Sequence, residues 1–285
     1  MPDARLIFST GSLYPLDTWR CFELAKEAGF DGIEIMCDER WTTRDPLYLN
    51  RLMETFDLPI FVCHTPFGSL VPGWSSQPDP IGMIYRTLEL AGYVGARSIV
   101  VHLPRTVGWV NVSFNGQGGW RLPWISTDGA VKQWIEHDLR RVQAQTPIRI
   151  GLENMPAREW LGMTFDPTMW NEVASWSRVH DWLTLDTTHW ATKKVDPVAA
   201  YQAAGGRVCH VHLSNFDGQE HRLPHQGLMD LGKFLRQLTM DSYAGTIALE
   251  LHPAALAFTD DLTMRRLLRE SVSYCREHLL ASGDR

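Results

Sequence analysis

Short apolar runs alternate with longer segments of helical periodicity along almost the whole chain. Each run is rich in Ile, Val and Leu and has the length of a strand that is buried on both faces. We therefore predict eight strands, at residues 5–10, 31–36, 59–64, 97–102, 148–153, 182–186, 207–213 and 245–251. Apolar residues at helical intervals between these runs predict helices at residues 16–28, 80–94, 129–144, 167–178, 196–204, 230–240 and 260–280. Asp166-Pro167 and Asp196-Pro197 have the pattern of an N-cap followed by Pro at the first helical position.

The order of these segments predicts the fold class. Strands that alternate with helices pair in parallel through right-handed crossovers, and eight such units close into a (β/α)8 barrel. The competing open, doubly wound sheet normally carries a Gly-rich phosphate-binding turn after its first strand, whereas FSTGSLYP at residues 8–15 contains one Gly. No change of composition divides the chain. We therefore predict an α/β protein with a single TIM-barrel domain over residues 1–285.

One connection, at about residues 103–128, is much longer than the others. Loops of this length inside compact domains are usually lids, binding loops or disordered segments. The segment contains Trp109, Trp120 and Trp124, and this aromatic content argues against disorder. We interpret it as an insertion between the fourth strand and the next helix that forms either a lid or a subunit contact.

Composition and charge narrow the classes of function. The chain has 285 residues and a formal net charge of −6, which disfavours the broad positive surface that nucleic acids require. Its five cysteines form no CxxC pair, which indicates reduced thiols rather than a disulfide framework. The sequence shows neither a signal-peptide pattern nor an apolar segment of about 18 residues, so we expect a cytoplasmic protein with no membrane partner.

Metal-competent side chains recur where the predicted strands end. The third to eighth strands end with, or contain, His64, His102, Glu153, Asp186, His212 and Glu250. A single such residue would be read as a polar cap at the barrel mouth, but the carboxyl ends of all barrel strands meet at one face, where active sites lie. Six together therefore predict a metal site. Oxygen and nitrogen donors without thiolates suit Mn²⁺, Co²⁺, Zn²⁺ or Mg²⁺ in a catalytic site that is open to substrate.

A histidine-rich stretch, HVHLSNFDGQEHRLPHQG at residues 210–227, contains one of these candidates. His212 ends the predicted seventh strand and faces the metal site. His210 lies two residues earlier on the same strand face, so we expect it one layer deeper, as a core histidine or a support for the ligands. The remainder reads as a loop over the pocket, in which His221 and Arg222 are candidate substrate contacts.

The segments VCHTPF, VVHLP, GLENMP, LDTTHW, HVHLSNF and ALELHP resemble, in order, the strand-end motifs of the xylose isomerase-like TIM barrel superfamily. This group includes sugar phosphate isomerase/epimerase-like proteins, endonuclease IV and ketose epimerases. The resemblance covers about residues 5–280 and is specific for the fold and the metal site, and much less so for the substrate. It implies that one divalent metal is held by Glu153, Asp186, His212 and Glu250.

The same resemblance implies roles for residues around that metal. His189 matches a histidine that touches substrate in epimerases and binds a third zinc in the nuclease. His64 and His102 match ligands of the nuclease's first zinc, so they either hold a second metal or line the pocket. Glu34 matches a recurring acidic position near the pocket, and we expect it to contact substrate. Arg222 resembles an arginine that contacts substrate oxygens in epimerases.

The resemblance implies a metal-dependent isomerase or epimerase of carbohydrate metabolism, acting on a sugar or polyol-like carbonyl compound. Glu153 and Glu250 would serve as catalytic base and acid, one removing the proton next to the carbonyl and the other returning it through an enediolate. His189 would move or orient a hydroxyl proton. We expect a small sugar-like substrate and no organic cofactor, and the sequence is compatible with a homo-oligomer.

The alternative implied by the same motifs is an endonuclease IV-like phosphodiesterase that cleaves DNA at abasic sites. All but one of that enzyme's metal-ligand positions are filled here. The exception is an Asp two residues before the loop histidine His221, where this chain has Gln219. A neutral amide is a poor replacement for an anionic ligand, although Glu220 or Asp217 could serve in another register. Together with the negative net charge, Gln219 favours the isomerase, and we do not expect a nucleic-acid partner. A third alternative, a binding barrel without activity, is disfavoured by the intact ligand set.

Overall fold

The computed structural model describes residues 4–280 except 69, 107, 115–116, 125–127 and 161–162. Eight parallel strands close into a barrel in the order β1, β12, β11, β10, β7, β4, β3 and β2. Residues Arg5 to Phe8 of β1 pair with Thr246 to Leu249 of β12 and close the ring. The barrel strands are β1 (Arg5–Ser9), β2 (Gly32–Met36), β3 (Ile60–His64), β4 (Ser98–His102), β7 (Arg149–Glu153), β10 (Leu183–Asp186), β11 (Val208–Leu213) and β12 (Thr246–Leu249). The prediction of a (β/α)8 barrel is confirmed.

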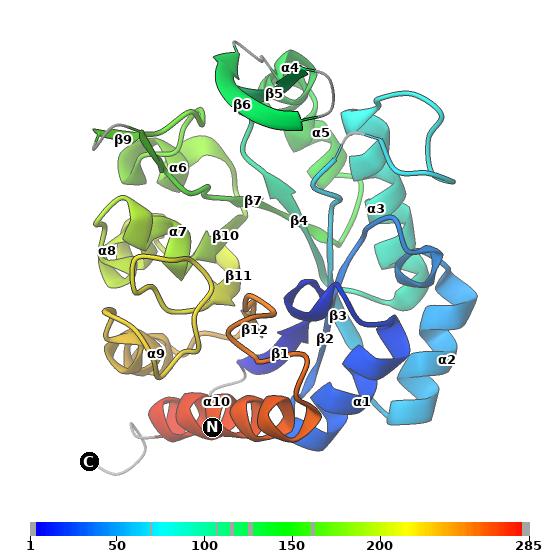
Figure 1. Ribbon diagram of the computed structural model, residues 1–285, viewed down its shortest axis with the longest axis vertical. Coiled ribbons are helices and arrows are strands. Elements are labelled where there is room, and N and C mark those ends of the chain that lie inside the picture. The colour runs from blue at the N-terminus through cyan, green and yellow to red at the C-terminus, as the bar shows by residue number, and fades with distance from the viewer. Residues whose placement is uncertain are drawn as a thin grey trace.

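Helices surround the barrel, as Figure 1 shows. They are α1 (Thr18–Ala28), α2 (Pro46–Phe56), α3 (Pro80–Val94), α4 (Gly129–His137), α5 (Leu139–Gln143), α6 (Val173–Val179), α7 (Thr187–Thr192), α8 (Pro197–Ala204), α9 (Leu231–Met240) and α10 (Asp261–Leu280), with two 3-10 turns, η1 (Thr10–Leu13) and η2 (Trp41–Thr43). The sequence prediction missed α2 and α7. Helix α2 nevertheless carries the Asp-Pro signal, because Asp45 caps it and accepts a hydrogen bond from the Tyr48 amide at 2.8 Å.

Two apolar layers position the polar ends of the strands. The larger layer lies between the strands and the helices and includes Cys63. The smaller one fills the barrel interior and consists of Ile7, Val62, Val100 and Ala248. Because side chains alternate along a strand, the residues two positions after Val62, Val100 and Ala248 also face the interior. These residues are His64, His102 and Glu250. The site residues therefore lie directly on top of an apolar layer of the barrel.

One of the two Asp-Pro predictions is correct. Asp196 caps α8, where its carboxylate accepts a hydrogen bond from the Val198 amide at 2.9 Å. Asp166-Pro167 begins no helix, and α6 starts only at Val173. The Asp166 carboxylate is instead occupied by the side chains of Asn171 and Lys193, at 2.9 and 2.6 Å. These contacts hold the segment in an irregular conformation, so the helix begins later in the sequence than predicted.

The insertion after β4 contains secondary structure that the sequence prediction lacked. Strands β5 (Gly108–Phe114) and β6 (Gln117–Trp124) pair in antiparallel register as a hairpin. In Figure 1 the hairpin lies at the top of the view, beyond the ring of barrel strands. A second short antiparallel pair, β8 (Arg158–Trp160) with β9 (Met163–Phe165), follows β7. The role of the hairpin as lid or subunit contact depends on side chains outside those that the structure describes and stays a prediction. Among the described helices, none combines the length and apolar character that crossing a membrane would need.

Replacing His180 is expected to reduce the sensitivity of the fold to acid. His180 is 2% exposed at the end of α6, and neither ring nitrogen has a hydrogen-bond partner among the described residues. Burial lowers its pKa from 6.5 to about 4, with a smaller contribution from Arg140 that Asp181 opposes. The unfolded chain therefore binds this proton first, and the free energy of unfolding falls as the pH drops from about 6.5 towards about 4. We expect H180L to lose part of this pH dependence in urea unfolding measured at several pH values. The exposed His137 on α4 offers the matched control H137L, and an equal effect of both substitutions would contradict the prediction.

Candidate functional site

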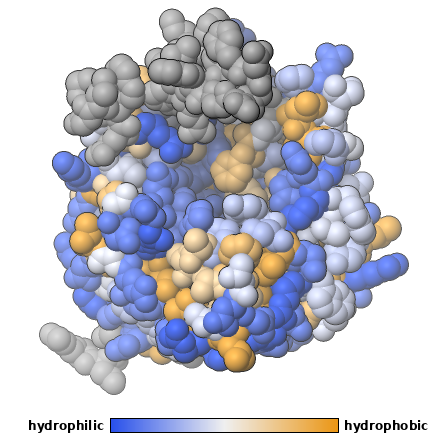
Figure 2. All heavy atoms as spheres, in the orientation of Figure 1, coloured by the Kyte–Doolittle hydropathy of each residue, from blue (hydrophilic) through white to orange (hydrophobic). Residues whose placement is uncertain are grey.

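Four buried side chains from four strands converge at the carboxyl end of the barrel. Glu153, Asp186, His212 and Glu250 each offer one ligand atom, and these atoms all lie within 4.8 Å of one another. Nδ1 of His212 is 2.9 Å from Oε1 of Glu153, 3.0 Å from Oε2 of Glu250 and 3.8 Å from Oδ2 of Asp186. The four residues predicted as metal ligands are therefore brought together. A hollow with mainly hydrophilic surroundings is visible over the middle of the barrel in Figure 2.

The charges of this group suit a divalent cation. Burial raises the pKa of Asp186 well above its usual range, and the carboxylates of Glu250 and Glu153 raise it further. Oδ2 of Asp186 and Oε2 of Glu153 are buried, and no group among the described residues donates a hydrogen bond to either. Three carboxylates packed around one imidazole nitrogen form an oxygen-rich donor set with one nitrogen, which fits Mn²⁺, Co²⁺, Zn²⁺ or Mg²⁺.

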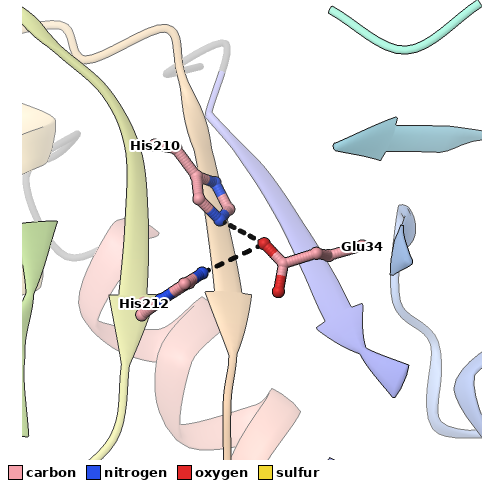
Figure 3. A group of neighbouring side chains, drawn as sticks. All are labelled: Glu34, His210 and His212. Carbon is pink, nitrogen blue, oxygen red and sulfur yellow. Dashed lines mark hydrogen bonds and ion pairs between the residues drawn. The ribbon is translucent and has the colours of Figure 1, made fainter. Parts of the chain in front are cut away.

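His212 is held from the side opposite the carboxylate group by Glu34 (Figure 3). Its Nε2 lies 3.0 Å from Oε2 of Glu34, and Nε2 of His210 lies 2.6 Å from the same oxygen. Nδ1 of His210 is in turn 2.7 Å from the hydroxyl of Thr246. With Nε2 of His212 donating to Glu34, its Nδ1 is left as the atom that faces the carboxylates. Metal-binding histidines commonly donate their second ring nitrogen to a carboxylate in this way.

The ionised form of Glu34 is favoured in this position, although the residue is fully buried. Burial alone would raise the pKa of Glu34, but its electrostatic interactions and hydrogen bonds with His212 and His210 outweigh burial and hold the pKa well below its usual range. Glu34 has no exposed surface, and its partner in β3 is Val62, one layer below His64. Glu34 therefore lies beneath the site with two histidines as its hydrogen-bond partners, and its contact with substrate stays a prediction.

His64 and His102 form a second group with Glu153. Their Nε2 atoms lie 3.4 and 3.2 Å from Oε2 of Glu153, and the two rings are 4.8 Å apart. Nδ1 of His64 donates a hydrogen bond to the carbonyl oxygen of Thr65 at 2.7 Å, so Nε2 is the ring nitrogen that faces Glu153. The Phe67 ring, 69% exposed, lies 5.5 and 5.1 Å from the two imidazoles. The pair thus lines one wall of the site next to an exposed aromatic ring.

His189 lies on the opposite side of the carboxylates and is fixed by two backbone contacts. Asp186 caps α7 by accepting a hydrogen bond from the His189 amide at 2.7 Å, and Nδ1 of His189 donates to the carbonyl oxygen of Asn154 at 2.8 Å. Burial lowers the pKa of His189 to about 3, so the ring is neutral near pH 7, with Nε2 as an acceptor.

The Asn154 side chain also exchanges two hydrogen bonds with the Asp186 backbone, at 3.0 and 2.8 Å. It therefore links β7 to β10 and α7 next to the site. Sequence reasoning assigned no role to Asn154, although its place directly after Glu153 in GLENMP was a usable signal.

The loop after β11 brings two of its predicted contacts to different places. Nδ1 of His221 is 3.2 Å from the Glu250 carbonyl oxygen, and its ring is 5.5 Å from that of His189, so His221 borders the site. Arg222 instead bonds within its own loop, to Asp217 at 3.1 Å and to the side chain of Gln219. The structure thus does not aim Arg222 at the carboxylate group. Glu220 is the loop carboxylate near the site, with Oε2 3.9 Å from Nε2 of His189.

Comparisons with known proteins agree with this fold. Residues 22–277 match the family described as "Xylose isomerase-like TIM barrel". An uncharacterized protein of Mycobacterium leprae, ML2432, is 25% identical, with 98% of this chain and 99% of that protein covered. Among solved structures, a 3-keto-D-glucoside 4-epimerase from E. coli has a TM-score of 0.66 at 20% identity, covering 96% of this chain and 99% of the epimerase. A D-allulose 3-epimerase from Methylomonas sp. has a TM-score of 0.67 at 17% identity, covering 97% and 98%.

Proposed function

Because the chain belongs to the xylose isomerase-like TIM barrel family, we propose that it is a divalent-metal-dependent isomerase or epimerase of a sugar or polyol-like carbonyl compound. One observation carries this proposal. Glu153 and Glu250 approach the same nitrogen of His212 at 2.9 and 3.0 Å, from β7 and from the end of β12. Two strands separate β7 from β12 in the barrel, so the glutamates flank the group from different sides. Proton removal on one face of a substrate and return on the other requires such a pair.

The names of the structural neighbours support the same class of reaction. The two solved structures described above are of a 3-keto-D-glucoside 4-epimerase and a D-allulose 3-epimerase, and another neighbour is described as D-tagatose 3-epimerase-like. At identities of 20% or less these likenesses identify a fold rather than a substrate. They make ketoses and keto-sugars the first compounds to test.

Glu153, Asp186, His212 and Glu250 would hold the metal in this proposal. When bound, a divalent metal polarises a carbonyl and so acidifies the adjacent C–H bond. One of Glu153 and Glu250 would take the proton from the carbon next to the carbonyl, and the other would deliver a proton to the opposite face of that carbon. His189, neutral and held by Asn154, offers Nε2 to a substrate hydroxyl and orients it. His64, His102 and Phe67 form a wall for the sugar.

Two further residues take roles that differ from substrate contact. Glu34 positions His212 from below, since it is fully buried against the two histidines. Arg222 holds the loop around Asp217 and Gln219, so it acts on the substrate only through the shape of this loop.

Phosphodiester hydrolysis remains the second candidate, because two additional groups of ligand-type atoms surround the first. His64, His102 and Glu153 form one of them, and Asp186, His189 and His221 form the other. Glu220, 3.9 Å from His189, could supply the anionic ligand that Gln219 does not. This candidate requires about three zinc ions per chain and cleavage of abasic-site DNA, as in metal-cluster hydrolases. Elemental analysis of the purified protein together with an incision assay decides between the two.

The proposed epimerase activity predicts metal-dependent exchange of a substrate proton with solvent. In D₂O with Mn²⁺, we expect at least one member of a panel of ketoses, inososes and keto-sugars to gain deuterium at the carbon next to its carbonyl. The exchange, followed by NMR or mass spectrometry, should stop on chelation with EDTA and return with added metal. The double variant E153Q/E250Q, purified identically, controls for contaminating epimerases. Absence of exchange across the panel in metal-loaded protein would count against the proposal.

A further inference from the structure

A second cavity opens at the end of the barrel opposite the carboxylate group. Its volume is about 340 Å³, and its lining includes Arg5, Arg97, Ser98, Arg149, Cys209 and Thr246. Arg5, Arg149 and Thr246 are the first residues of β1, β7 and β12, and Arg97 immediately precedes β4. The cavity therefore lies at the amino-terminal ends of the strands. The apolar residues Val62, Val100 and Ala248 lie between it and the candidate metal site, beside the hydrogen-bonded chain that runs from Thr246 through His210 and Glu34 to His212.

Among the residues that the structure describes, the three arginines of this cavity have no acidic partner. Many other arginines of the protein pair with carboxylates, for example Arg141 with Asp138 and Arg276 with Asp31. Among the described residues, no carboxylate lies within 4.0 Å of the guanidinium group of Arg5, Arg97 or Arg149. In a chain of net charge −6, three uncompensated positive charges around one hollow create a local field that attracts anions.

Two of the three guanidinium groups are held by aromatic rings. The Arg97 guanidinium lies 5.2 Å from the centroid of the Phe61 ring, and that of Arg149 lies 4.4 Å from the Trp182 ring. The backbones of the two arginines are also joined, because the Arg149 amide donates to the Arg97 carbonyl oxygen at 3.0 Å. Guanidinium groups that are already placed lose less conformational freedom when an anion binds.

We propose that this cavity binds a small phosphorylated anion. Guanidinium groups form paired, charge-assisted hydrogen bonds with phosphate oxygens, and their planar geometry matches that anion. The volume falls at the lower end of the range for small-molecule pockets, so it suits a compact metabolite. The concave shape and the acidic charge of the whole chain argue against a nucleic-acid backbone as the ligand. The site is distinct from the proposed epimerase site, because none of the residues that would hold the metal or contact the substrate lines it.

Inorganic pyrophosphate is a suitable probe for this site. Titration calorimetry is performed with the full chain in EDTA, which prevents capture of the probe by metal at the opposite end. We expect one saturable site and a weakening of roughly tenfold or more in R97S/R149S, since charge-assisted hydrogen bonds are lost. The double variant R51S/R269S removes the same charge from exposed positions on α2 and α10 and should bind as the wild type does. R5S tests the third arginine without disturbing an aromatic contact, and thermal melting of each variant verifies folding.

Three further results decide the assignment. E153Q should leave pyrophosphate binding unchanged, because Glu153 lies at the other end of the barrel. Citrate, a small carboxylate anion, should bind more weakly than pyrophosphate, and equal binding would overturn the assignment to phosphate. The proposal is wrong if pyrophosphate gives no saturable heat, or if R51S/R269S weakens binding as much as R97S/R149S does.

Discussion

Replacing Asp186 with Asn should abolish metal-dependent stabilisation while raising the thermal stability of the metal-free protein. Asp186 is fully buried beside Glu153 and Glu250, and without a cation these carboxylates repel one another. Asn has the same shape. Its Oδ1 can still cap α7 by accepting from the His189 amide, a contact of 2.7 Å, and its amide group can donate to a neighbouring carboxylate. The substitution thus removes a charge without removing the cap.

The same substitution should cost metal affinity and activity. A ligand present at 1,000 times its Kd stabilises the wild-type fold by about 4 kcal/mol, which is several degrees in Tm. We expect this Mn²⁺-induced shift to disappear in D186N, and metal-dependent deuterium exchange to fall by roughly 10³-fold or more, because several kcal/mol of charge stabilisation are lost.

Differential scanning fluorimetry with and without Mn²⁺ measures both expected effects of D186N, the higher Tm of the metal-free protein and the loss of the Mn²⁺-induced shift. Asp181, exposed and close in sequence, provides the matched control D181N, which should change neither the metal-free Tm nor the Mn²⁺ shift. If D186N keeps the full Mn²⁺ shift, Asp186 is not a ligand. If its metal-free Tm falls as well, the residue serves the fold rather than the metal.

The convergence of the candidate metal-binding residues could be predicted, because it depends on regular features of the fold. Apolar runs located all eight strands, and parallel closure necessarily brings the ends of β3, β4, β7, β10 and β11 to one face. His64, His102 and Asp186 were therefore identifiable from their positions at strand ends alone. The separation of the polar layer from the apolar layer below follows from the same alternation.

The depth of Glu34 could not be predicted in this way. Alternation correctly points Glu34 into the barrel, but the register between β2 and β3 shifts between Ile33 and Glu34. This shift pairs Glu34 with Val62, one layer below His64, and moves its carboxylate from the pocket to the space under His212. Its partner His210 is 176 residues away in sequence, across the barrel interior. Such a contact is fixed only once the barrel has closed and the register between neighbouring strands is set.

The direction of the Arg222 side chain, in the loop after β11, could not be predicted for a different reason. The prediction that Arg222 contacts substrate rested on its place in the sequence, whereas its direction depends on backbone geometry. The Arg222 amide and carbonyl group exchange hydrogen bonds with those of Asn215 at 2.9 Å, and His221 has a φ of 60°. This bridge turns the Arg222 side chain back towards Asp217. Loop conformations of this kind leave no periodic signal in a sequence.

Replacing Glu34 with Gln should weaken metal binding although Glu34 touches no metal in the proposed site. The carboxylate accepts hydrogen bonds from His212 and His210 at 3.0 and 2.6 Å, and all three residues are fully buried. A negative partner at Nε2 makes the opposite nitrogen of His212 a stronger donor to a cation and fixes the ring orientation. A neutral amide of the same shape keeps the packing and removes the charge. We expect the Kd for Mn²⁺ to rise by roughly 10–100-fold, the range found when carboxylates behind metal-binding histidines are lost.

The experiment must separate this positioning role from a general loss of stability. Calorimetric titration of metal-free E34Q with Mn²⁺ gives the Kd, and the Tm of the metal-free variant gives the effect on the fold. H210N changes the other partner of Glu34 but leaves the contact between Glu34 and His212, so its Kd should rise less than that of E34Q. If E34Q lowers the metal-free Tm but binds Mn²⁺ with the wild-type Kd, Glu34 stabilises the barrel interior only. If H210N and E34Q weaken Mn²⁺ binding equally, the direct contact of Glu34 with His212 at 3.0 Å is not what positions His212, and His210 is needed for the effect.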